Sequence, residues 1–387
     1  MIYLDSAATA KRSKIDNIII GEMTNAMTEL WQNPSSLYAA NVKDKINKCR
    51  SNIAKFIGAK PEEIYFTSGA SESNNWAIQG WFDELSNRGL ARKYIITTSI
   101  EHKSILSMEQ NNRLKSWTVN CNVDKFGIVK YELLKHYLSV FKPDPILVSV
   151  HMANNEIGTI QDIKKISDLV HSYGGILHVD ATQTFGHIPI NVNELGIDLM
   201  SASGHKISPV LKGVGFLYKR NGINIQPLIY GAQENGLRGG TENIFGIVGL
   251  SKALELCDIS TQKIQELCDK RDYFIQLLKS KFSKSGFGIK LNGHPAQRLP
   301  NNINVTFPQN ITGEALLYTL EMSGIYISTS SACNSKEIKP SYVLKAIGLS
   351  DADAMKTVRF SLPNDITYED IDNVVNEIDK SIRIIEV

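Results

Sequence analysis

The feature that most constrains the fold is a regular alternation of helical and strand-like segments that begins near Asn41. Short apolar runs predict strands at 63–67, 93–98, 146–151, 176–179, 199–201 and 214–218. Stretches with apolar residues at helical spacing predict helices between them, at 43–57, 71–85 and 163–172. Alternation of this kind is typical of an α/β domain whose mostly parallel sheet is covered by helices on both faces.

The pattern changes after a long helical stretch predicted near 245–281. Strands are then expected at 303–307, 325–327 and 358–361, with helices at 313–322 and 368–382. A chain of 387 residues suits two domains around a sizeable core. We therefore expect a large α/β domain over 14–255 and a smaller α+β domain over 256–387, which also includes residues 1–13.

Composition and charge exclude several functional classes. The formal net charge of +2 gives no electrostatic reason to expect nucleic acid or an acidic membrane as the main partner. The first residues do not read as a secretory signal, and no apolar run approaches the ~18 residues that a membrane span needs. The five cysteines include no C-x-x-C pair, which argues against a structural zinc site or a disulfide framework. We expect a cytoplasmic protein.

The first predicted strand ends in a turn that could bind a phosphate. Gly69 permits a tight turn, and Ala70 and Ser71 open a helix whose free N–H groups could bind an anion. Taken alone, the segment is more typical of an ordinary helix start in which Glu72 serves as the acid of a capping box.

Other strand ends carry residues suited to an aldehyde cofactor, and ligands of open α/β sheets bind at this edge. Asp180 could pair with a positively charged ring nitrogen, and Lys206 could form a Schiff base with an aldehyde. His102 could exchange protons and lie against a ring. Each also has an ordinary explanation, respectively a helix cap or metal ligand, a solvated surface lysine, and a turn residue.

The remaining strand ends add hydrogen-bond donors. Ser203 and His205 precede Lys206 and could donate to a phosphate, and Asn154 offers an amide after the strand 146–151. No single residue decides the function. Five strand ends that together provide a phosphate cradle, a histidine, amides, an acid and a lysine favour a shared cofactor site.

Cys333 lies in a loop of small polar residues between the strand 325–327 and a helix predicted at 341–347. An exposed thiol in such a loop suits a reactive cysteine. From this context alone, an unused loop cysteine and a functional one are equally open.

Taken in order, these segments resemble the cysteine desulfurases of the NifS/IscS type, which are fold-type-I, class-V aminotransferase-like enzymes dependent on pyridoxal 5'-phosphate (PLP). The resemblance runs nearly end to end. It implies a large, mostly parallel, seven-stranded sheet domain and a smaller α+β domain that carries the Cys333 loop. The matching segments are 3–9, 33–36, 66–74, 101–103, 154–158, 178–183, 203–206, 238–243, 331–333 and 358–361.

The resemblance implies a role for each matching residue at the cofactor. Lys206 would hold PLP as a Schiff base, His102 would stack on the ring and exchange protons, and Asp180 would pair with the ring nitrogen. Gln183 would bond the ring hydroxyl, and Asn154 would contact both cofactor and substrate. The phosphate would be held by Ala70, Ser71, Ser203 and His205, together with Thr241 of the partner subunit in a homodimer.

The resemblance also implies the reaction. Asn33, Asn154 and Arg359 would bind the substrate L-cysteine, and a guanidinium suits a bidentate carboxylate clamp. Cys333 would take the sulfur as a persulfide, L-alanine would leave, and a sulfur-acceptor protein (an iron–sulfur scaffold or a thiolation protein) would receive it. Lys336 is a candidate for lowering the pKa of the thiol. No resident metal ion is implied, and Cys333 would share an iron–sulfur cluster with a partner only transiently.

The sequence departs from the family pattern in several places. Ser71 stands where threonine is usual, the segment 207–213 differs from the usual loop after the lysine, and 230–235 differs from the usual glycine-rich segment. Alternatives of related and of different classes stay open. These are a selenocysteine lyase or cysteine-sulfinate desulfinase, and a non-catalytic scaffold of a sulfur-transfer network.

Overall fold

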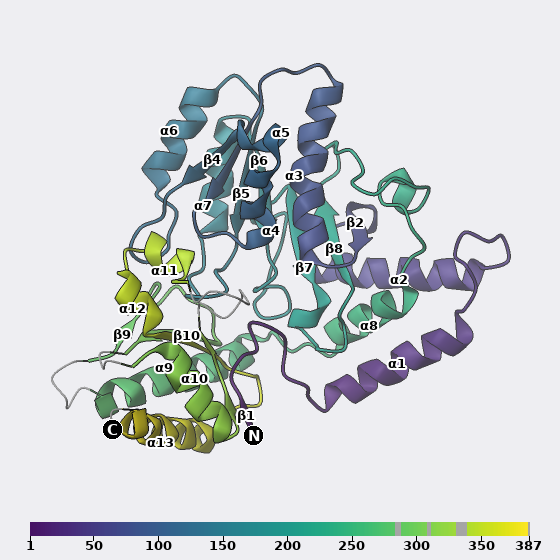
Figure 1. The fold of residues 1–387 in the computed structure, drawn as a ribbon. Helices are drawn as coiled ribbons and strands as arrows, with labels where there is room; N and C mark the ends of the chain where they lie inside the picture. Colours follow the sequence, from purple (N-terminus) through teal and green to yellow (C-terminus); the bar gives the residue numbers. More distant parts are fainter. Residues whose placement is uncertain (283–287, 308–310, 330–338, 386–387) are drawn as a thin grey trace.

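The computed structural model describes residues 1–282, 288–307, 311–329 and 339–385. A large sheet with helices on both faces forms the upper part of the molecule in Figure 1, and a smaller layer of helices and strands lies beside its lower edge. None of the helices in these ranges combines the length and apolar character required to cross a bilayer.

The large sheet has seven strands in the order β2-β8-β7-β6-β5-β3-β4. Neighbours from β4 to β7 are parallel, whereas β8 runs antiparallel to both β7 and β2. This confirms the predicted mostly parallel sheet. The strands are β2 (Ile64–Thr67), β3 (Tyr94–Thr98), β4 (Thr118–Cys121), β5 (Ile146–His151), β6 (Ile176–Asp180), β7 (Leu199–Ser203) and β8 (Gly215–Lys219).

The edge strand β4 was not predicted from the sequence. It is only partly buried along most of its length, so it lacks the apolar run by which a central strand is recognised.

Side chains alternate between the two faces of the sheet, as the strand period requires. On one face, residues such as Leu177 and Val179 join an apolar cluster with α2, α6, α7 and α8. On the other, Leu147 and Leu199 pack with α3, α4, η2 and α5. The helices are α1 (Ile15–Glu29), α2 (Ala40–Ile57), α3 (Ala70–Asn87), α4 (Lys103–Leu106), η2 (Ser107–Gln110), α5 (Asn112–Lys115), α6 (Tyr131–Phe141), α7 (Ile163–Ser172) and α8 (Ile244–Glu255).

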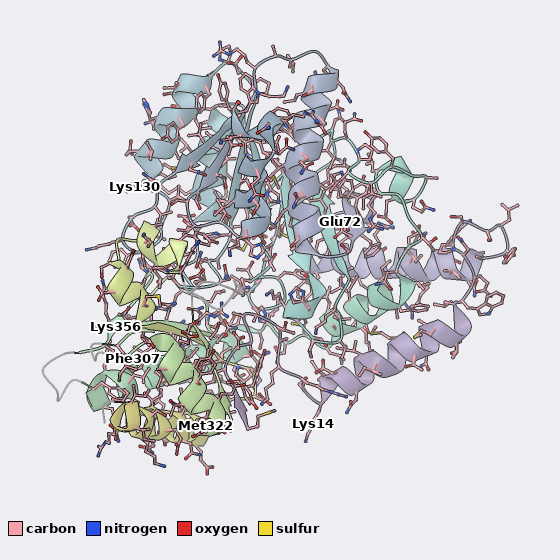
Figure 2. The ribbon with its side chains drawn as sticks, viewed as in Figure 1. Lys14, Glu72, Lys130, Phe307, Met322 and Lys356 are labelled. Atoms are coloured by element: carbon pink, nitrogen blue, oxygen red, sulfur yellow. The ribbon has the colours of Figure 1, made fainter. Side chains whose placement is uncertain are left out.

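The smaller layer has its own antiparallel sheet, in the order β12-β13-β10-β9, and its own apolar cluster. Figure 2 shows Phe307 and Lys356 beside each other there, where the N–H of Phe307 donates to the carbonyl of Lys356 (3.2 Å). Its strands are β9 (Lys290–Leu291), β10 (Asn302–Thr306), β11 (Ile325–Tyr326), β12 (Ser328–Thr329) and β13 (Thr357–Ser361). Its helices are α9 (Thr261–Phe282), α10 (Gly313–Met322), α11 (Tyr342–Ala346), α12 (Asp351–Met355) and α13 (Tyr368–Ile385).

The single helical stretch predicted near 245–281 is wrong in one respect, because α8 and α9 are separate helices. Between them the carboxylate of Asp258 accepts a hydrogen bond from the N–H of Ser260 (3.0 Å). Such a local side-chain turn competes with helical hydrogen bonding. The domain boundary at residue 255 stays a prediction.

The N-terminal segment lies against both parts of the chain. The strand β1 (Ile2–Tyr3) pairs in parallel with β11, and the N–H of Ser361 donates to the carbonyl of Leu4 (2.7 Å). A few residues later, the N–H of Ala10 donates to the carbonyl of His205 (3.1 Å), beside the end of β7. The first ten residues therefore run from the smaller layer to the carboxyl edge of the large sheet.

Candidate active site

The turn between β2 and α3 is tight because glycines lie on both sides of a close backbone contact. Gly69 has a φ of +150°, and a Cβ on Gly215 would lie 2.6 Å from the Cα of Gly69. Glu72 accepts from the N–H (2.8 Å) and hydroxyl (2.6 Å) of Ser68. This acid therefore stabilises the turn, and the first N–H groups of α3, beginning at Ala70, remain suited to an anion.

The end of β7 lies directly against that turn. A Cβ on Gly69 would be 3.4 Å from the hydroxyl of Ser203, and the same hydroxyl is hydrogen-bonded to Nδ1 of His205 (2.8 Å). Burial, together with the charges of Lys206 and Lys212, lowers the pKa of His205 to about 4. Ser203 and His205 thus lie with Gly69 where the sequence predicts a phosphate.

Lys206 is held by the N-terminal segment. It ends the short helix η3 (Gly204–Lys206), and its Nζ donates to the carbonyls of Ala7 (2.7 Å) and Ala8 (2.8 Å). The amide of Gln183 donates to the same Ala7 carbonyl (3.1 Å). The side chains of Lys206 and Gln183 therefore donate to the same carbonyl, and this closeness is what a cofactor in contact with both would require.

Asp180 ends β6 and is only 5% exposed. Its Oδ1 accepts from the N–H of Thr182 (2.9 Å) and from the Thr182 hydroxyl, and its Oδ2 accepts from Nδ2 of Asn74 (2.8 Å). These donors are neutral, so a protonated ring nitrogen would be a suitable charged partner for this buried carboxyl group.

His102 lies at the start of α4, in an open groove that also includes Ser71. Surrounding protein atoms desolvate its charged form and lower its pKa, an effect that Lys206 increases and Asp180 opposes. The charges of Lys206 and Asp180 therefore both act on His102. Together with the Ser203 turn, these three residues fit an aldehyde cofactor that carries a ring nitrogen and a phosphate.

The turn that carries His102 has a buried polar support. The carboxylate of Glu101 is fully buried; its Oε1 accepts from the Thr98 hydroxyl (2.6 Å), and its Oε2 lies 3.1 Å from Nδ1 of His151. The hydroxyl of Tyr342, on α11, donates to the carbonyl of Glu101 (2.6 Å). The smaller layer thereby contacts the segment next to His102.

Asn154 and Arg359 lie close to this edge but already have protein partners. Asn154 is buried, accepts from the N–H groups of Glu156 and Ile157, and donates to the carbonyl of Ile100 (2.9 Å). Its second N–H is the group that a ligand could use.

Arg359 makes an ion pair that was not predicted. Its Nη2 donates to Asp5 (2.6 Å), and its Nη1 donates to the carbonyl of Asn155 (3.0 Å). The Nε atom is buried and has no hydrogen-bond partner among the described residues. The guanidinium is therefore fixed in orientation with one buried donor unused.

Two other predicted residues come from exposed segments. Asn33 lies between α1 and α2, a connection that Figure 1 shows away from the end of β7. Thr241 lies in an exposed segment and lines a pocket with Thr67 and Ser68 of the same chain. Cys333 and Lys336 lie outside the described residues.

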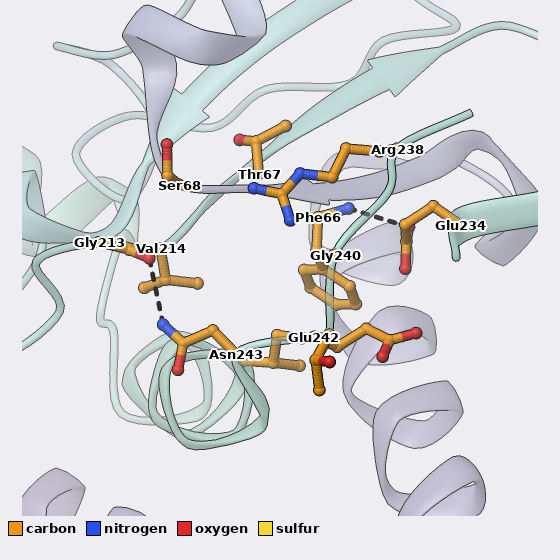
Figure 3. Close-up of a pocket in the computed structure, with 12 residues that line it drawn as sticks. Phe66, Thr67, Ser68, Gly213, Val214, Glu234, Arg238, Gly240, Glu242 and Asn243 are labelled. Atoms are coloured by element: carbon orange, nitrogen blue, oxygen red, sulfur yellow. Dashed lines mark hydrogen bonds between the residues drawn. The ribbon is translucent and has the colours of Figure 1, made fainter. Parts of the chain in front are cut away.

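The pocket that Thr241 lines is drawn in Figure 3, where Arg238 extends over the β2–α3 turn. Arg238 donates to Glu72 (2.8 and 3.1 Å), and Arg50 makes a two-point contact with Glu234 (both 2.8 Å). Glu234 also accepts from the N–H of Phe66 (3.0 Å), one of the dashed bonds in Figure 3. The segment 230–235, whose sequence departs from the family pattern, is thus fixed to β2 through Glu234, and the following Arg238 is bonded to α3.

Sequence reasoning missed Glu234 and also Asn74. Glu234 has a φ of +49°, a conformation that no sequence rule assigns to glutamate. Asn74 gave a weak signal, because two consecutive asparagines in a helix are poor helix formers and invite another explanation.

The unusual loop after Lys206 is also fixed. The hydroxyl of Ser208 donates to the carboxylate of Asp16, and both residues are buried. Leu211 is fully buried in the large apolar cluster. These contacts connect the loop to the start of α1.

Comparisons with known proteins agree with this geometry. Residues 2–374 match the family described as Aminotransferase class-V. The chain is 42% identical to a cysteine desulfurase IscS of Dictyoglomus turgidum, over 99% of this chain and 94% of that relative. It is 43% identical to a cysteine desulfurase IscS of Methanosarcina thermophila, over 99% of this chain and 92% of that relative.

A solved structure of a NifS-like protein superposes with a TM-score of 0.87 at 33% identity, covering 99% of both chains. The chain therefore belongs to the class-V aminotransferase family and, within it, to the PLP-dependent cysteine desulfurases of the NifS/IscS type.

Proposed function

We propose that this PLP-dependent cysteine desulfurase takes sulfur from L-cysteine through the residues gathered at the carboxyl edge of its large sheet, and passes that sulfur to an acceptor protein. The observation that carries the proposal is the convergence of a lysine, a buried carboxylate and a histidine on one site. Lys206, Asp180 and His102 come from three different strand ends, and the charges of Lys206 and Asp180 both act on His102.

The assignment of residues to the cofactor follows from their chemistry. Lys206 would carry PLP, Asp180 would balance its ring nitrogen, and Gln183 would bond its hydroxyl. The phosphate would lie among Ala70, Ser71, Ser203 and His205. When bound, PLP supplies an aldehyde for Schiff-base formation and a ring that accepts electrons.

The protein's own groups would then orient the substrate and move protons. The carbonyls of Ala7 and Ala8 fix the direction of Lys206 Nζ, which would take the α-proton of cysteine. Arg359 would bind the substrate carboxylate with its remaining donors, because Asp5 and Asn155 already set the plane of the guanidinium. His102 would exchange protons at the opposite side of the site.

The sulfur-receiving group is assigned from the sequence, since Cys333 lies outside the described residues. In the proposed reaction the Cys333 thiolate bonds to the substrate sulfur as the carbon–sulfur bond breaks. The products are a Cys333 persulfide and L-alanine. The persulfide then goes to an acceptor such as an iron–sulfur scaffold or a thiolation protein.

We further propose a cytoplasmic homodimer. Asn33 and Thr241 lie in exposed segments of the chain, where a second copy could place them at the partner's site. This supports the expectation that Thr241 reaches the phosphate across a subunit interface.

The test compares wild type with Lys206→Ala and Cys333→Ala by measuring L-alanine formed from L-cysteine in PLP-loaded protein. We expect Lys206→Ala to lose the PLP absorbance that borohydride changes. Its rate of L-alanine formation should fall about 10²- to 10⁴-fold. Cys333→Ala should bind PLP normally but form no protein persulfide by mass spectrometry. Alanine formation from cysteine that survives in both variants would contradict the proposal. Faster turnover of selenocysteine or cysteine sulfinate would instead favour the alternative activities.

A further inference from the structure

A chain of hydrogen bonds runs from Asp180 to His102 through two residues to which the proposed reaction gives no role. Nδ2 of Asn74 donates to Oδ2 of Asp180 (2.8 Å) and also to the hydroxyl of Ser104 (2.9 Å). The hydroxyl of Ser104 lies 2.8 Å from Nδ1 of His102. The backbone N–H of Ser104 donates to the same nitrogen (3.1 Å).

The direction of every bond in this chain follows from the groups themselves. The Asp180 carboxylate only accepts, so the Asn74 amide must present its NH₂ group to it. The Ser104 oxygen accepts from Asn74, so its proton is available for His102. A backbone N–H only donates, so Nδ1 of His102 must carry a lone pair and the neutral ring must carry its proton on Nε2.

Burial of Asn74 lowers the stability of the fold, because one of its polar atoms has no partner in the described part of the chain. Asn74 is 1% exposed, and its Oδ1 has no hydrogen-bond partner among the described residues. An unsatisfied buried acceptor costs about 1–3 kcal/mol. The amide is therefore oriented by its donor side, toward Asp180 and Ser104.

We propose that Asn74 and Ser104 are positioning residues that connect Asp180 to His102 and hold His102 as the neutral Nε2–H form. This inference deepens the proposed function and rests on it for the role of His102. In this form Nε2 donates a hydrogen bond to a ligand but cannot accept a proton. His102 can gain a proton only at Nδ1, after the Ser104 hydroxyl has turned away and the hydrogen bond from the Ser104 N–H has broken.

The surroundings of His102 favour its neutral form. The groups that face it are Asp180 from β6, Glu101 and Lys103 from its own segment, and Lys206 from η3. Desolvation has the largest influence on the pKa of His102 and lowers it, while the two carboxylates raise it and the two ammonium groups lower it. The two donors at Nδ1 therefore decide where the ring proton lies, because hydrogen bonds to the neutral form oppose protonation.

The first test measures the wild-type protein, and a variant serves only to assign the signals. Protein labelled with ¹⁵N-histidine, with and without PLP, is examined by NMR through the couplings between ring nitrogens and ring protons. His102→Gln assigns the His102 signals among the eight histidines. We expect a protonated Nε2 and an unprotonated Nδ1 at neutral pH, and a proton found on Nδ1 would overturn the proposal.

The second test removes the positioning groups and follows the His102 titration. Ser104→Ala deletes one donor to Nδ1, so we expect the pKa of His102 to rise by about one unit. Ser104→Thr keeps the hydroxyl and should restore the wild-type titration. Ser107→Ala, which removes a hydroxyl from the same groove, is the matched control and should leave it unchanged.

Asn74→Asp tests the far end of the chain. The new carboxylate would accept the Ser104 proton instead of donating to its oxygen, which should raise the pKa of His102 as Ser104→Ala does. Asn75→Asp makes the same charge change one residue on, where the side chain donates to the carbonyls of Ser71 and Ser104 and accepts from Gln79 (3.2 Å), and should shift the pKa less. Equal shifts in the two variants, or none in Ser104→Ala, would refute the connection. Because these titrations use PLP-free protein without substrate, their outcome is independent of whether cysteine is the substrate.

Discussion

Near its carboxyl edge the large sheet has an apolar face and a polar face, and β6 shows the difference within five residues. Leu177 and Val179 are fully buried in the apolar cluster that includes α7 and α8. His178 and Asp180 point to the other face, where their neighbours are polar. Farther from that edge this face is apolar as well, since Leu147 and Leu199 pack there with α3. Apolar packing on both faces therefore holds the strands in place, and the strand ends can carry polar groups.

The polar groups of β6 are stabilised by hydrogen bonds rather than by burial of apolar area. Nδ1 of His178 is hydrogen-bonded to the hydroxyl of Ser149 (2.8 Å), and its Nε2 to the hydroxyl of Ser201 (3.0 Å). Both ring nitrogens of this fully buried histidine are therefore satisfied, as a buried polar group requires. This comparison predicts that changes to the polar groups near the carboxyl edge affect chemistry and pH response, whereas changes to the apolar residues of β6 affect stability alone.

The largest effect is expected for Asp180→Asn. The variant keeps the shape and the bond from Thr182 but removes the charge that would balance the ring nitrogen. Breaking a buried ion pair costs about 3–5 kcal/mol, so the rate of alanine formation should fall about 10²- to 10³-fold. The free energy of unfolding of the PLP-free protein, measured in urea, should change little. Wild-type activity in this variant would show that the two faces do not differ as described.

His178→Gln should alter how stability depends on pH. Burial lowers the pKa of His178 from 6.5 to about 4. Between these values the unfolded chain binds a proton that the folded chain does not, so stability falls as the pH falls from about 6.5 to 4. The contribution is at most about 3 kcal/mol. Glutamine can keep the hydrogen bonds but does not titrate, so urea unfolding across this range should show a shallower pH dependence than wild type.

Val179→Ala changes the neighbouring residue on the apolar face. Removing two buried methyl groups should lower the free energy of unfolding by about 2 kcal/mol. Activity per folded molecule should remain at the wild-type level. A selective loss of PLP binding would mean that the apolar face contributes to the site beyond holding the strand.

The smallest effect is expected for Asp162→Ala at the start of α7, which covers the apolar face. Its carboxylate accepts from the N–H of Lys165 (3.1 Å), an ordinary helix cap. Losing such a cap costs about 1 kcal/mol and should not change turnover. His102 caps α4 in the same way. Comparing Asp162→Ala with His102→Gln would separate a cap that only stabilises its helix from one that also belongs to the active site.

Much of the fold could be predicted from the sequence because the central strands are short, strongly apolar runs. Strands β5 and β6 can both be recognised in this way. The rule that ligands bind at strand ends also places Asp180, His102 and Lys206 at one edge from the sequence alone. The edge strand β4 and the break between α8 and α9 were missed, since neither produces an apolar pattern.

The site was predicted less completely because its contacts are distant in sequence. The bond from Lys206 to the carbonyl of Ala7 joins residues 199 positions apart, and the pair of Arg359 with Asp5 joins residues 354 apart. Backbone carbonyls leave no mark in a sequence. Asn74 and Ser104 likewise look ordinary until the fold brings them between Asp180 and His102.

The N-terminal segment also limits when the enzyme can become functional during synthesis. Its strand β1 pairs with β11, Leu4 is bonded to Ser361, and Asp5 is bonded to Arg359. These partners are made only when most of the chain has been translated. Contacts of such long sequence separation form slowly. The amine of Lys206 therefore gains its two carbonyl partners only after the C-terminal third has folded. A nascent or truncated chain should have a formed large sheet but an incompletely oriented lysine.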